Sequence, residues 1–165
     1  MLAPEIVQFV ESGISVLVGT RDAALRPEGI RSAGAFADGE RGEVTLFLPV
    51  ATSGRTVENL RQNGRIAATF TRAIDHRAIQ LKGQVVDIRP ATEPERERIE
   101  RYLEALSLDW GFVGVPRKAT RAMNCWPAFA VRFRVESSFE QTPGPGAGQQ
   151  ISKETPPSLA FREAH

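Results

Sequence analysis

The feature that most constrains the fold is a succession of short segments in which apolar and polar residues alternate, joined by short connections. Such segments are typical of β-strands, and a parallel sheet would need a helix between most of them. We therefore expect a mainly β protein, a six-stranded antiparallel barrel with a few helices. The predicted strands cover residues 14–20, 30–37, 43–48, 65–71, 77–88 and 127–137.

Two local signals refine this expectation. Asp38-Gly39 lies between the second and third predicted strands and indicates a hairpin. Gly83 lies in the middle of the fifth predicted strand, where it indicates a bulge or bend of the kind found where a barrel turns a corner. Residues 21–29 are expected to form a turn, because they contain Asp22 and Pro27.

Helices are predicted over residues 4–12, 54–63 and 92–106. The third begins with a capping box formed by Thr92 and Glu95. Residues 107–125 are expected to be irregular, and proline and glycine dominate from Thr142 onward. We therefore expect one barrel domain over residues 1–137, followed by a Pro/Gly-rich C-terminal arm or tail over residues 138–165.

Composition excludes several classes of protein. The 165 residues carry 21 basic and 20 acidic side chains, a balance that argues against a nucleic-acid binder. One cysteine, Cys125, rules out an intramolecular disulfide framework and a multi-cysteine zinc site, and with only two histidines we expect no metal. The longest apolar stretch is far shorter than the roughly 20 residues of a membrane span. We expect a cytoplasmic protein.

Residues 48–56 form the first candidate site. They run from a predicted strand into a predicted helix and include Thr52, Ser53, Gly54, Arg55 and Thr56. A helix N-terminus presents unpaired N–H groups, and hydroxyls and an arginine add donors suited to an anion. The alternative is ordinary helix capping beside a solvated arginine.

Two further segments could line a ligand. Arg31 is followed by the small residues Ser32, Ala33 and Gly34, which leave room for a flat group; the alternative is a strand packed beneath a helix. On the fifth predicted strand, Gln80 shares a face with small and polar neighbours, which could equally be a solvent-facing surface.

Three other features do not indicate chemistry. His76 follows Asp75 in a predicted turn and has no paired nucleophile, so a general base is not expected there. Cys125 has no histidine partner nearby in the sequence and is expected to be inert. The glycine-rich residues 143–148 lack a following lysine or helix and indicate a loop.

Taken in order, these segments resemble a known family. The order is an arginine that begins a strand, a hairpin, Ser-x-Arg at a helix start, Asn59-Leu60-x-x-Asn63, a strand, and R-x-x-Q-x-x-G from Arg77 to Gly83. The sequence resembles the pyridoxamine 5'-phosphate oxidase-like FMN-binding split-barrel family over about residues 5–90, with residues 127–137 closing the barrel. Residues 139–148 are similar to an uncharacterised subgroup. The resemblance implies a homodimer with FMN at its interface.

The resemblance also implies roles for individual residues. Arg31 and Arg55 match the arginines that hold the FMN phosphate, and Pro49 and Val50 match the strand end that borders the flavin. The cofactor-binding residues expected in this sequence are Arg31, Ser32, Ala33, Gly34, Pro49, Val50, Ser53, Arg55, Thr56 and Gln80. Residues 32–34 would offer backbone groups to the flavin ring, and Gln80 would also contact it.

Three positions depart from the family pattern. Phe36 and Thr56 stand where basic residues are common, and Ala78 stands where a glutamine is expected, although Gln80 lies on the same strand face. The leading hypothesis is an FMN-dependent oxidoreductase that acts on an unidentified small molecule. The alternatives are a non-enzymatic split-barrel binder of haem or F420, and an interaction protein with an empty cleft.

Overall fold

The computed structural model describes residues 1–152, 157 and 159; the rest of the predicted C-terminal arm lies outside the described residues. Its helices are α1 (Pro4–Glu11), α2 (Gly54–Asn63), α3 (Glu93–Phe112) and α4 (Arg117–Arg121). Its strands are β1 (Ser15–Arg21), β2 (Pro27–Arg31), β3 (Ala35–Asp38), β4 (Glu43–Pro49), β5 (Arg65–Thr71), β6 (Ala78–Pro90) and β7 (Ala128–Glu140).

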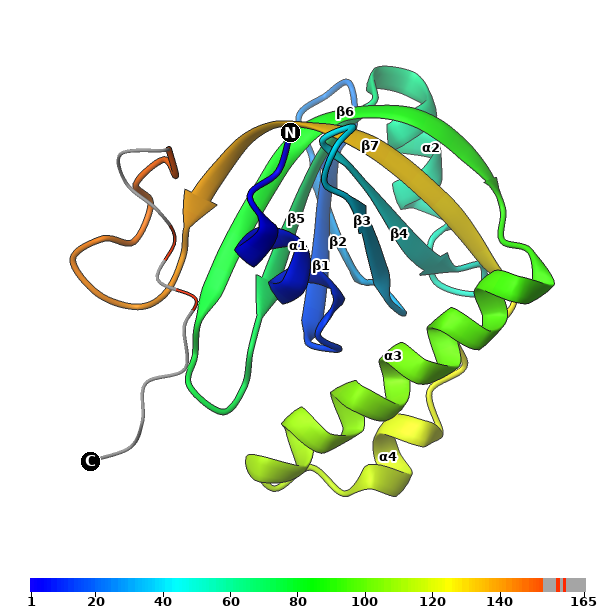
Figure 1. Ribbon diagram of the computed structural model, residues 1–165. Helices are drawn as coiled ribbons and strands as arrows, with labels where there is room; N and C mark the ends of the chain where they lie inside the picture. Colours follow the sequence, from blue (N-terminus) through cyan, green and yellow to red (C-terminus); the bar gives the residue numbers. More distant parts are fainter. Residues whose placement is uncertain (153–156, 158, 160–165) are drawn as a thin grey trace.

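The strands form one antiparallel sheet in the order β2-β1-β5-β6-β7-β4-β3. Figure 1 shows the sheet curling strongly, with the long strands β6 and β7 arching over the others. This architecture confirms the expected antiparallel β-barrel with a few helices, with seven strands in the described residues in place of the six predicted.

The two outer strands of the sheet, β2 and β3, are consecutive in the chain, and residues 32–34 join them. Ser32 N–H donates to the Val16 carbonyl on β1 (3.0 Å), and Ala33 N–H donates to the Phe47 carbonyl on β4 (2.7 Å). Phe47 N–H in turn donates to the Gly34 carbonyl (3.0 Å). The chain therefore changes its hydrogen-bonding partner from β1 to β4 within three residues, which closes the barrel.

The prediction of a single strand over residues 30–37 is wrong at this point. The Ser32 hydroxyl lies 2.8 Å from the Gly34 carbonyl oxygen and 2.9 Å from the Phe47 carbonyl oxygen, and this local bonding interrupts the ladder. The predicted turn over residues 21–29 is too long, because β2 already begins at Pro27. Proline is compatible with that place, since β2 is an edge strand.

The core fills the interior of the barrel with the inward-facing side chains of the strands. Helix α1 adds Ile6, Phe9 and Val10 from its apolar face. The largest fully buried side chains are Phe70, Phe133, Ile14, Leu46, Leu48, Ile79, Leu81, Leu106, Val10 and Val16, together with Phe47 and Ile99 of a second cluster that includes residues of α3. Alternation on β1 and β5 leaves one face of each strand inside and the other outward, as the sequence pattern predicts.

Gly83 marks a bulge in β6, as predicted. The register between β6 and β7 shifts between Lys82 and Gly83. A Cβ atom added at Gly83 would overlap the carbonyl group of Arg134 on β7, so only glycine allows the two strands to approach there.

Helices α2 and α3 lie on different sides of the barrel (Figure 1). The predicted ends of α2 are confirmed, with Gly64 as a left-handed C-cap at φ 66°. The capping box of Thr92 and Glu95 is present at the start of α3.

Among the described residues, no helix is long and apolar enough to cross a membrane.

The prediction that residues 107–125 are irregular is wrong in part. Helix α3 continues to Phe112, and α4 follows at Arg117–Arg121. The Glu104 carboxylate forms ion pairs with Arg117 and Arg121, which fastens α4 to α3. Glu104 is 13 residues from Arg117 and 17 from Arg121 in the sequence, so the periodicity of a single helix did not indicate these contacts.

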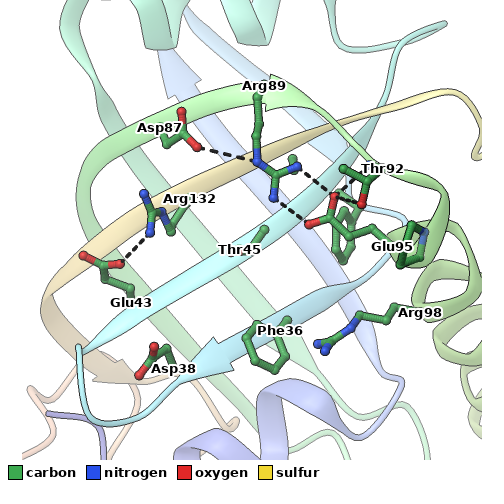
Figure 2. Close-up of a pocket in the computed structure, with 13 residues that line it drawn as sticks. Phe36, Asp38, Glu43, Thr45, Asp87, Arg89, Thr92, Glu95, Arg98 and Arg132 are labelled. Carbon is green, nitrogen blue, oxygen red and sulfur yellow. Dashed lines mark hydrogen bonds and ion pairs between the residues drawn. The ribbon is translucent and has the colours of Figure 1, made fainter.

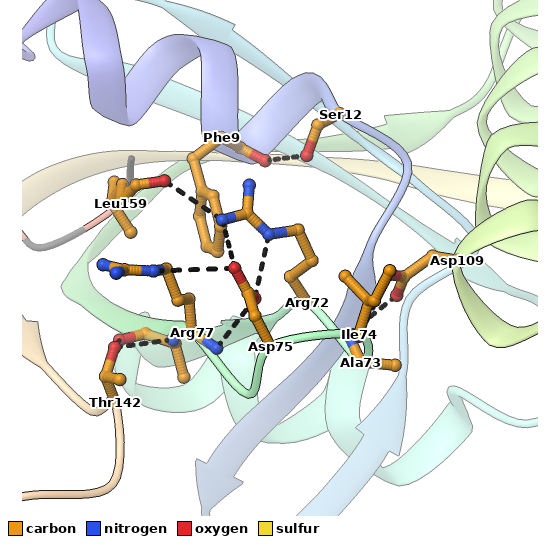
Figure 3. Close-up of polar contacts among 11 residues, drawn as sticks. Phe9, Ser12, Arg72, Ala73, Ile74, Asp75, Arg77, Asp109, Thr142 and Leu159 are labelled. Atoms are coloured by element: carbon orange, nitrogen blue, oxygen red, sulfur yellow. Dashed lines mark hydrogen bonds and ion pairs between the residues drawn. The ribbon is translucent and has the colours of Figure 1, made fainter. Parts of the chain in front are cut away.

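The connection between β5 and β6 is held by a polar network (Figure 3). Arg72 donates to both carboxylate oxygens of Asp75, at 3.0 Å and 2.6 Å, and Asp109 on α3 accepts from Ala73 N–H at 2.8 Å. Burial opposes ionisation of Asp75, but the hydrogen bonds from Arg72 and Arg77 leave its pKa below the ordinary value. Asp75 therefore has a structural role beside the exposed His76.

Strand β7 continues to Glu140, beyond the predicted end at residue 137. Residues 141–152 then return along it: Ile151 N–H donates to the Ser138 carbonyl (2.8 Å), and Gln150 bridges to Phe139. Farther along, the Leu159 side chain is buried in the core, and its carbonyl accepts from Arg72 (3.1 Å). Several described residues of the predicted arm thus lie against the barrel.

Candidate functional site

The first turn of α2 carries two buried hydroxyls that have no hydrogen-bond partner. Ser53, the N-cap, and Thr56 both have 0% exposure, and neither Ser53 Oγ nor Thr56 Oγ1 has a partner in the described structure. Arg55 lies between them in sequence, with a side chain that is 74% exposed and 3.3 Å from Glu28 on β2. Buried polar groups usually have partners, so this turn has unused donor capacity.

The position of this turn follows from the local sequence. Strand β4 ends at Pro49, and the N–H groups of Thr52 and Ser53 both donate to the Pro49 carbonyl at 3.1 Å, which turns the chain into α2. The helix N-terminus adds unpaired N–H groups and the positive end of the helix dipole. Together with the two hydroxyls and Arg55, these donors fit a bound anion.

Arg31 is not part of this group. In the β1–β2 register Arg31 is opposite Leu17 and Glu28 is opposite Thr20, and residues three apart on a strand project from opposite faces. Arg55 contacts Glu28, so Arg31 and Arg55 lie on opposite faces of β2. Within one chain the two arginines therefore do not form a single cluster, and their joint role in holding one phosphate stays a prediction.

Arg31 instead has structural partners. Its Nη1 donates to Ser15 Oγ at 2.7 Å, and its guanidinium lies 4.8 Å from the centre of the Trp110 ring on α3. Burial lowers the pKa of the Arg31 guanidinium from its ordinary value.

Residues 32–34 are buried beneath α3. Ala33 packs in a cluster with Phe47, Ile99 and Cys125, and a Cβ atom added at Gly34 would lie 3.1 Å from Tyr102 Cγ. The small side chains thus accommodate a helix, which is the alternative interpretation of this segment. The N–H groups of Ser32 and Ala33 and the Gly34 carbonyl already have partners within the barrel, so they are not available to a flavin ring.

Pro49 and Val50 lie at the end of β4, immediately before the α2 turn. Pro49 is buried, whereas Val50 is 42% exposed and its N–H donates to the Pro127 carbonyl at 2.9 Å. These two residues therefore border the turn that carries the unpaired hydroxyls.

Gln80 lies on the outward face of the sheet. The strand registers align Gln80, Thr69, Leu17 and Arg31 in one row across β6, β5, β1 and β2. Gln80 Nε2 donates to Thr69 Oγ1 at 3.0 Å. Leu17 in this row is 50% exposed. Gln80 on β6 and Arg31 on β2 therefore share a face of the sheet, but β5 and β1 lie between them.

The departures from the family pattern have different structural outcomes. Thr56 is buried, and Ala78 is buried with its N–H donating to Thr142 Oγ1 at 3.1 Å. Phe36 is 37% exposed, and the Arg98 guanidinium of α3 lies 4.4 Å from its ring centre. The Arg98 guanidinium thus places a positive charge beside Phe36, although Arg98 belongs to α3 and not to β3.

Sequence reasoning missed a groove beside Phe36 (Figure 2). It has a volume of about 450 Å³ and lies between the outward faces of β3, β4, β6 and β7 and the first turns of α3. The alternation of Arg132 and Arg134 on the last strand was the one available signal, but it does not show which other elements meet that face.

Other chemistry is not assembled in the described residues. They contain no group of three or more His, Cys, Asp and Glu side chains placed to hold a metal ion. Cys125 is buried, and burial raises the pKa of its thiol, which disfavours the reactive thiolate.

The sequence matches no family model and no curated protein. The fold does match solved structures. An F420 reductase has a TM-score of 0.57 and 14% identity, covering 82% of this chain and 98% of that one. An FMN-binding protein from Syntrophomonas wolfei subsp. wolfei has a TM-score of 0.55 and 12% identity, covering 82% and 86%. A Clostridium acetobutylicum protein related to general stress protein 26 of B. subtilis (pyridoxinephosphate oxidase family) has a TM-score of 0.54 and 19% identity, covering 91% and 93%.

These likenesses show the class of fold: the chain has a split-barrel fold similar to that of pyridoxamine 5'-phosphate oxidase-like proteins. The fold expected from the resemblance in the sequence is therefore confirmed.

Proposed function

We propose that this protein is an FMN-binding flavoprotein that acts as an oxidoreductase on a small molecule. The observation that carries the proposal is the pair of unpartnered buried hydroxyls, Ser53 Oγ and Thr56 Oγ1, at the N-terminus of α2. The likeness of the fold to an FMN-binding protein supports it.

In this proposal the α2 turn holds the FMN phosphate. Ser53 and Thr56 donate hydrogen bonds to phosphate oxygens, and Arg55 exchanges its exposed contact with Glu28 for a charge-assisted bond to the phosphate. Because both hydroxyls are buried, the groups around them must shift to admit a ligand. Pro49 and Val50 would border the cofactor, since they directly precede the turn.

A bound flavin supplies hydride or electron transfer, while the protein orients it and tunes its electronics. The proposal assigns phosphate binding to Ser53, Arg55 and Thr56. Arg31 is left out, because it lies on the opposite face of β2. A homodimer with the cofactor at its interface belongs to the proposal as well.

The test starts from the visible absorption spectrum of the purified protein, followed by titration of the apoprotein with FMN. Arg55→Gln should weaken FMN binding about tenfold or more, because it removes a charge-assisted contact. Arg61→Gln, an exposed position in the last turn of the same helix, is the matched control and should bind FMN normally.

Two results would contradict the proposal. One is a colourless protein that does not bind added FMN, and the other is equal FMN affinity of the Arg55 and Arg61 variants. A spectrum typical of F420 or of haem would favour the corresponding non-FMN alternative. Sedimentation of the FMN-loaded protein as a monomer would remove the dimer from the proposal.

A further inference from the structure

The groove of Figure 2 is built on the outward face of the sheet, on the side covered by the start of α3. The registers align Phe36 on β3, Thr45 on β4 and Arg132 on β7 in one row across the strands. The next row contains Phe47 and Ala130, each 2% exposed. Phe36 and the small exposed parts of Phe47 and Ala130 therefore form an apolar patch in a groove whose other lining residues are mostly polar or charged.

One wall of the groove is a closed ion pair. Arg89 donates to both Glu95 oxygens, at 2.7 Å and 2.8 Å, and Glu95 also accepts from Thr92 N–H at 2.8 Å. The hydrogen bonds from Arg89 and Thr92 outweigh burial and lower the pKa of Glu95 to about 2. These groups satisfy one another, so the wall is fixed and has little capacity left for a ligand.

The carboxylates around the groove all have arginine partners. Asp38 lies 3.6 Å from Arg41, and Asp87 lies 3.7 Å from Arg89. The buried Glu43 lies 3.5 Å from Arg132 and 3.3 Å from Arg134. With Glu95 paired to Arg89, no acidic side chain that lines the groove is left uncompensated.

Arg98 is different. Its guanidinium lies over the Phe36 ring, and it forms no ion pair with any residue that the structure describes. Arg132 has donors to spare as well, because its contact with Glu43 uses one edge of a guanidinium that carries five N–H donors. Two arginines with free donors thus line the groove beside this apolar patch, and no ion pair neutralises the positive charge of Arg98.

We propose that this groove binds a small organic anion with a planar apolar part. The anionic group pairs with Arg98 and Arg132, and the planar part lies against Thr45 and the apolar patch of Phe36, Phe47 and Ala130. Arginine suits this role because its fork of donors matches a carboxylate and its planar face stacks on an aromatic ring. Binding does not depend on a flavin; only the further step, that this anion is the oxidoreductase substrate, rests on the proposed function.

Benzoate is a suitable probe, because it joins a carboxylate to a flat apolar ring. We would titrate the isotope-labelled full-length protein with benzoate, benzamide or inorganic phosphate and follow the backbone amides by NMR. Benzoate should shift the amides of Phe36, Thr45 and Ala130. Benzamide, which lacks the charge, and phosphate, which lacks the ring, should each bind at least about tenfold more weakly.

Arg98→Gln should weaken benzoate binding about tenfold, and it should keep the fold, because it loses a contact with the exposed Phe36 ring but no ion pair. Arg101→Gln is the matched control: it lies on the same helix, is 70% exposed and pairs with Glu97 outside the groove. Equal affinity of these two variants, equal binding of benzoate and benzamide, or shifts confined to another surface would each overturn the proposal.

The same titration separates this proposal from the flavin proposal. A protein that binds benzoate in the groove but shows no FMN binding would retain the anion site and lose the proposed function. A protein that binds FMN but gives no benzoate shifts at Phe36 and Thr45 would support the flavin proposal and overturn the anion site in the groove.

Discussion

The guanidinium of Arg31 lies 4.8 Å from the centre of the Trp110 ring and donates a hydrogen bond to Ser15 Oγ. This contact joins the end of β2 to the last part of α3, at the side of the barrel where α3 covers residues 32–34. Arg31 therefore helps to hold a helix in place, on the opposite face of β2 from the α2 turn.

We expect Arg31→Lys to lower the free energy of unfolding by about 1 kcal/mol, because lysine cannot keep both the stacking and the hydrogen bond. Its FMN affinity should stay within a factor of about three of the wild type. Urea denaturation and FMN titration give the two values. A loss of FMN binding as large as that of Arg55→Gln would show that Arg31 contacts the phosphate after all.

Thr56→Val should leave the stability of the apoprotein unchanged or raise it by up to about 1 kcal/mol, because the buried hydroxyl has no partner to lose. The contrast is Thr20→Val. Thr20 Oγ1 accepts from Asn59 Nδ2 at 3.1 Å, and both residues are buried, so this variant should lose about 1–3 kcal/mol.

Urea denaturation of the two valine variants compares these stabilities, and FMN titration then adds the functional difference. Thr56→Val should bind FMN more weakly than the wild type. A large destabilisation of apo Thr56→Val would indicate that its hydroxyl has a structural partner, and would remove the main support for an anion site at the α2 turn.

Glu95 should make stability depend on pH in the acid range. Its pKa is about 2 in the folded protein, mainly because Arg89 donates to it, and its ordinary value is 4.5. A lowered folded-state pKa stabilises the protein above the unfolded-state pKa and loses that effect as the pH falls through the folded-state pKa. The contribution, on the order of 2 kcal/mol, should therefore be complete above about pH 5 and vanish near pH 2.

Denaturation of the wild type and Glu95→Gln across this range measures the contribution. The difference between them should shrink steadily from about pH 5 to about pH 2. Glu97→Gln, an exposed position on the same helix, is the control. A difference that does not change with pH would show that the Arg89–Glu95 pair does not contribute in this way.

Gly83→Ala should be strongly destabilising, by about 3 kcal/mol or more, because the added Cβ overlaps the carbonyl group of Arg134 and the backbone must move. Gly111→Ala is the matched control: no atom lies within 4 Å of an added Cβ there, and alanine favours a helix. This control should be slightly more stable than the wild type. Thermal unfolding of both variants distinguishes a specific close contact from a general effect of alanine.

Local patterns predicted most of the fold. The strand at Arg65–Thr71, the helix at Gly54–Asn63 and the bulge at Gly83 follow from alternation, capping and glycine, which act over a few neighbouring residues. The break at residues 32–34 could not be predicted in this way. It depends on Ser32 and Ala33 changing partners from β1 to β4, and the turn-favouring residues Ser32 and Gly34 are also compatible with a continuous strand.

The α2 turn and the groove also differ in how far local sequence patterns could predict them. The α2 turn is contiguous, so its hydroxyls and Arg55 could be predicted as a group from residues 48–56. The groove was missed because the hairpin that carries Phe36 and Thr45 is far in the sequence from Arg98 on α3 and from Arg132 on β7. The joint role of Arg31 and Arg55 stays a prediction, because a resemblance aligns residues along the chain but does not show which face of a strand carries them.

The place of β7 in the sheet has a consequence for how the protein is made. Among the residues that the structure describes, β7 is the last strand to leave the ribosome, yet it lies between β6 and β4 and pairs with both. Before residues 128–140 emerge, the earlier strands can form only two separate sheets, β2-β1-β5-β6 and β4-β3, linked by the chain at residues 32–34 and 50–64. The barrel must therefore close after most of the chain has been translated, and nascent chains that stall before β7 would expose two unpaired strand edges to chaperones.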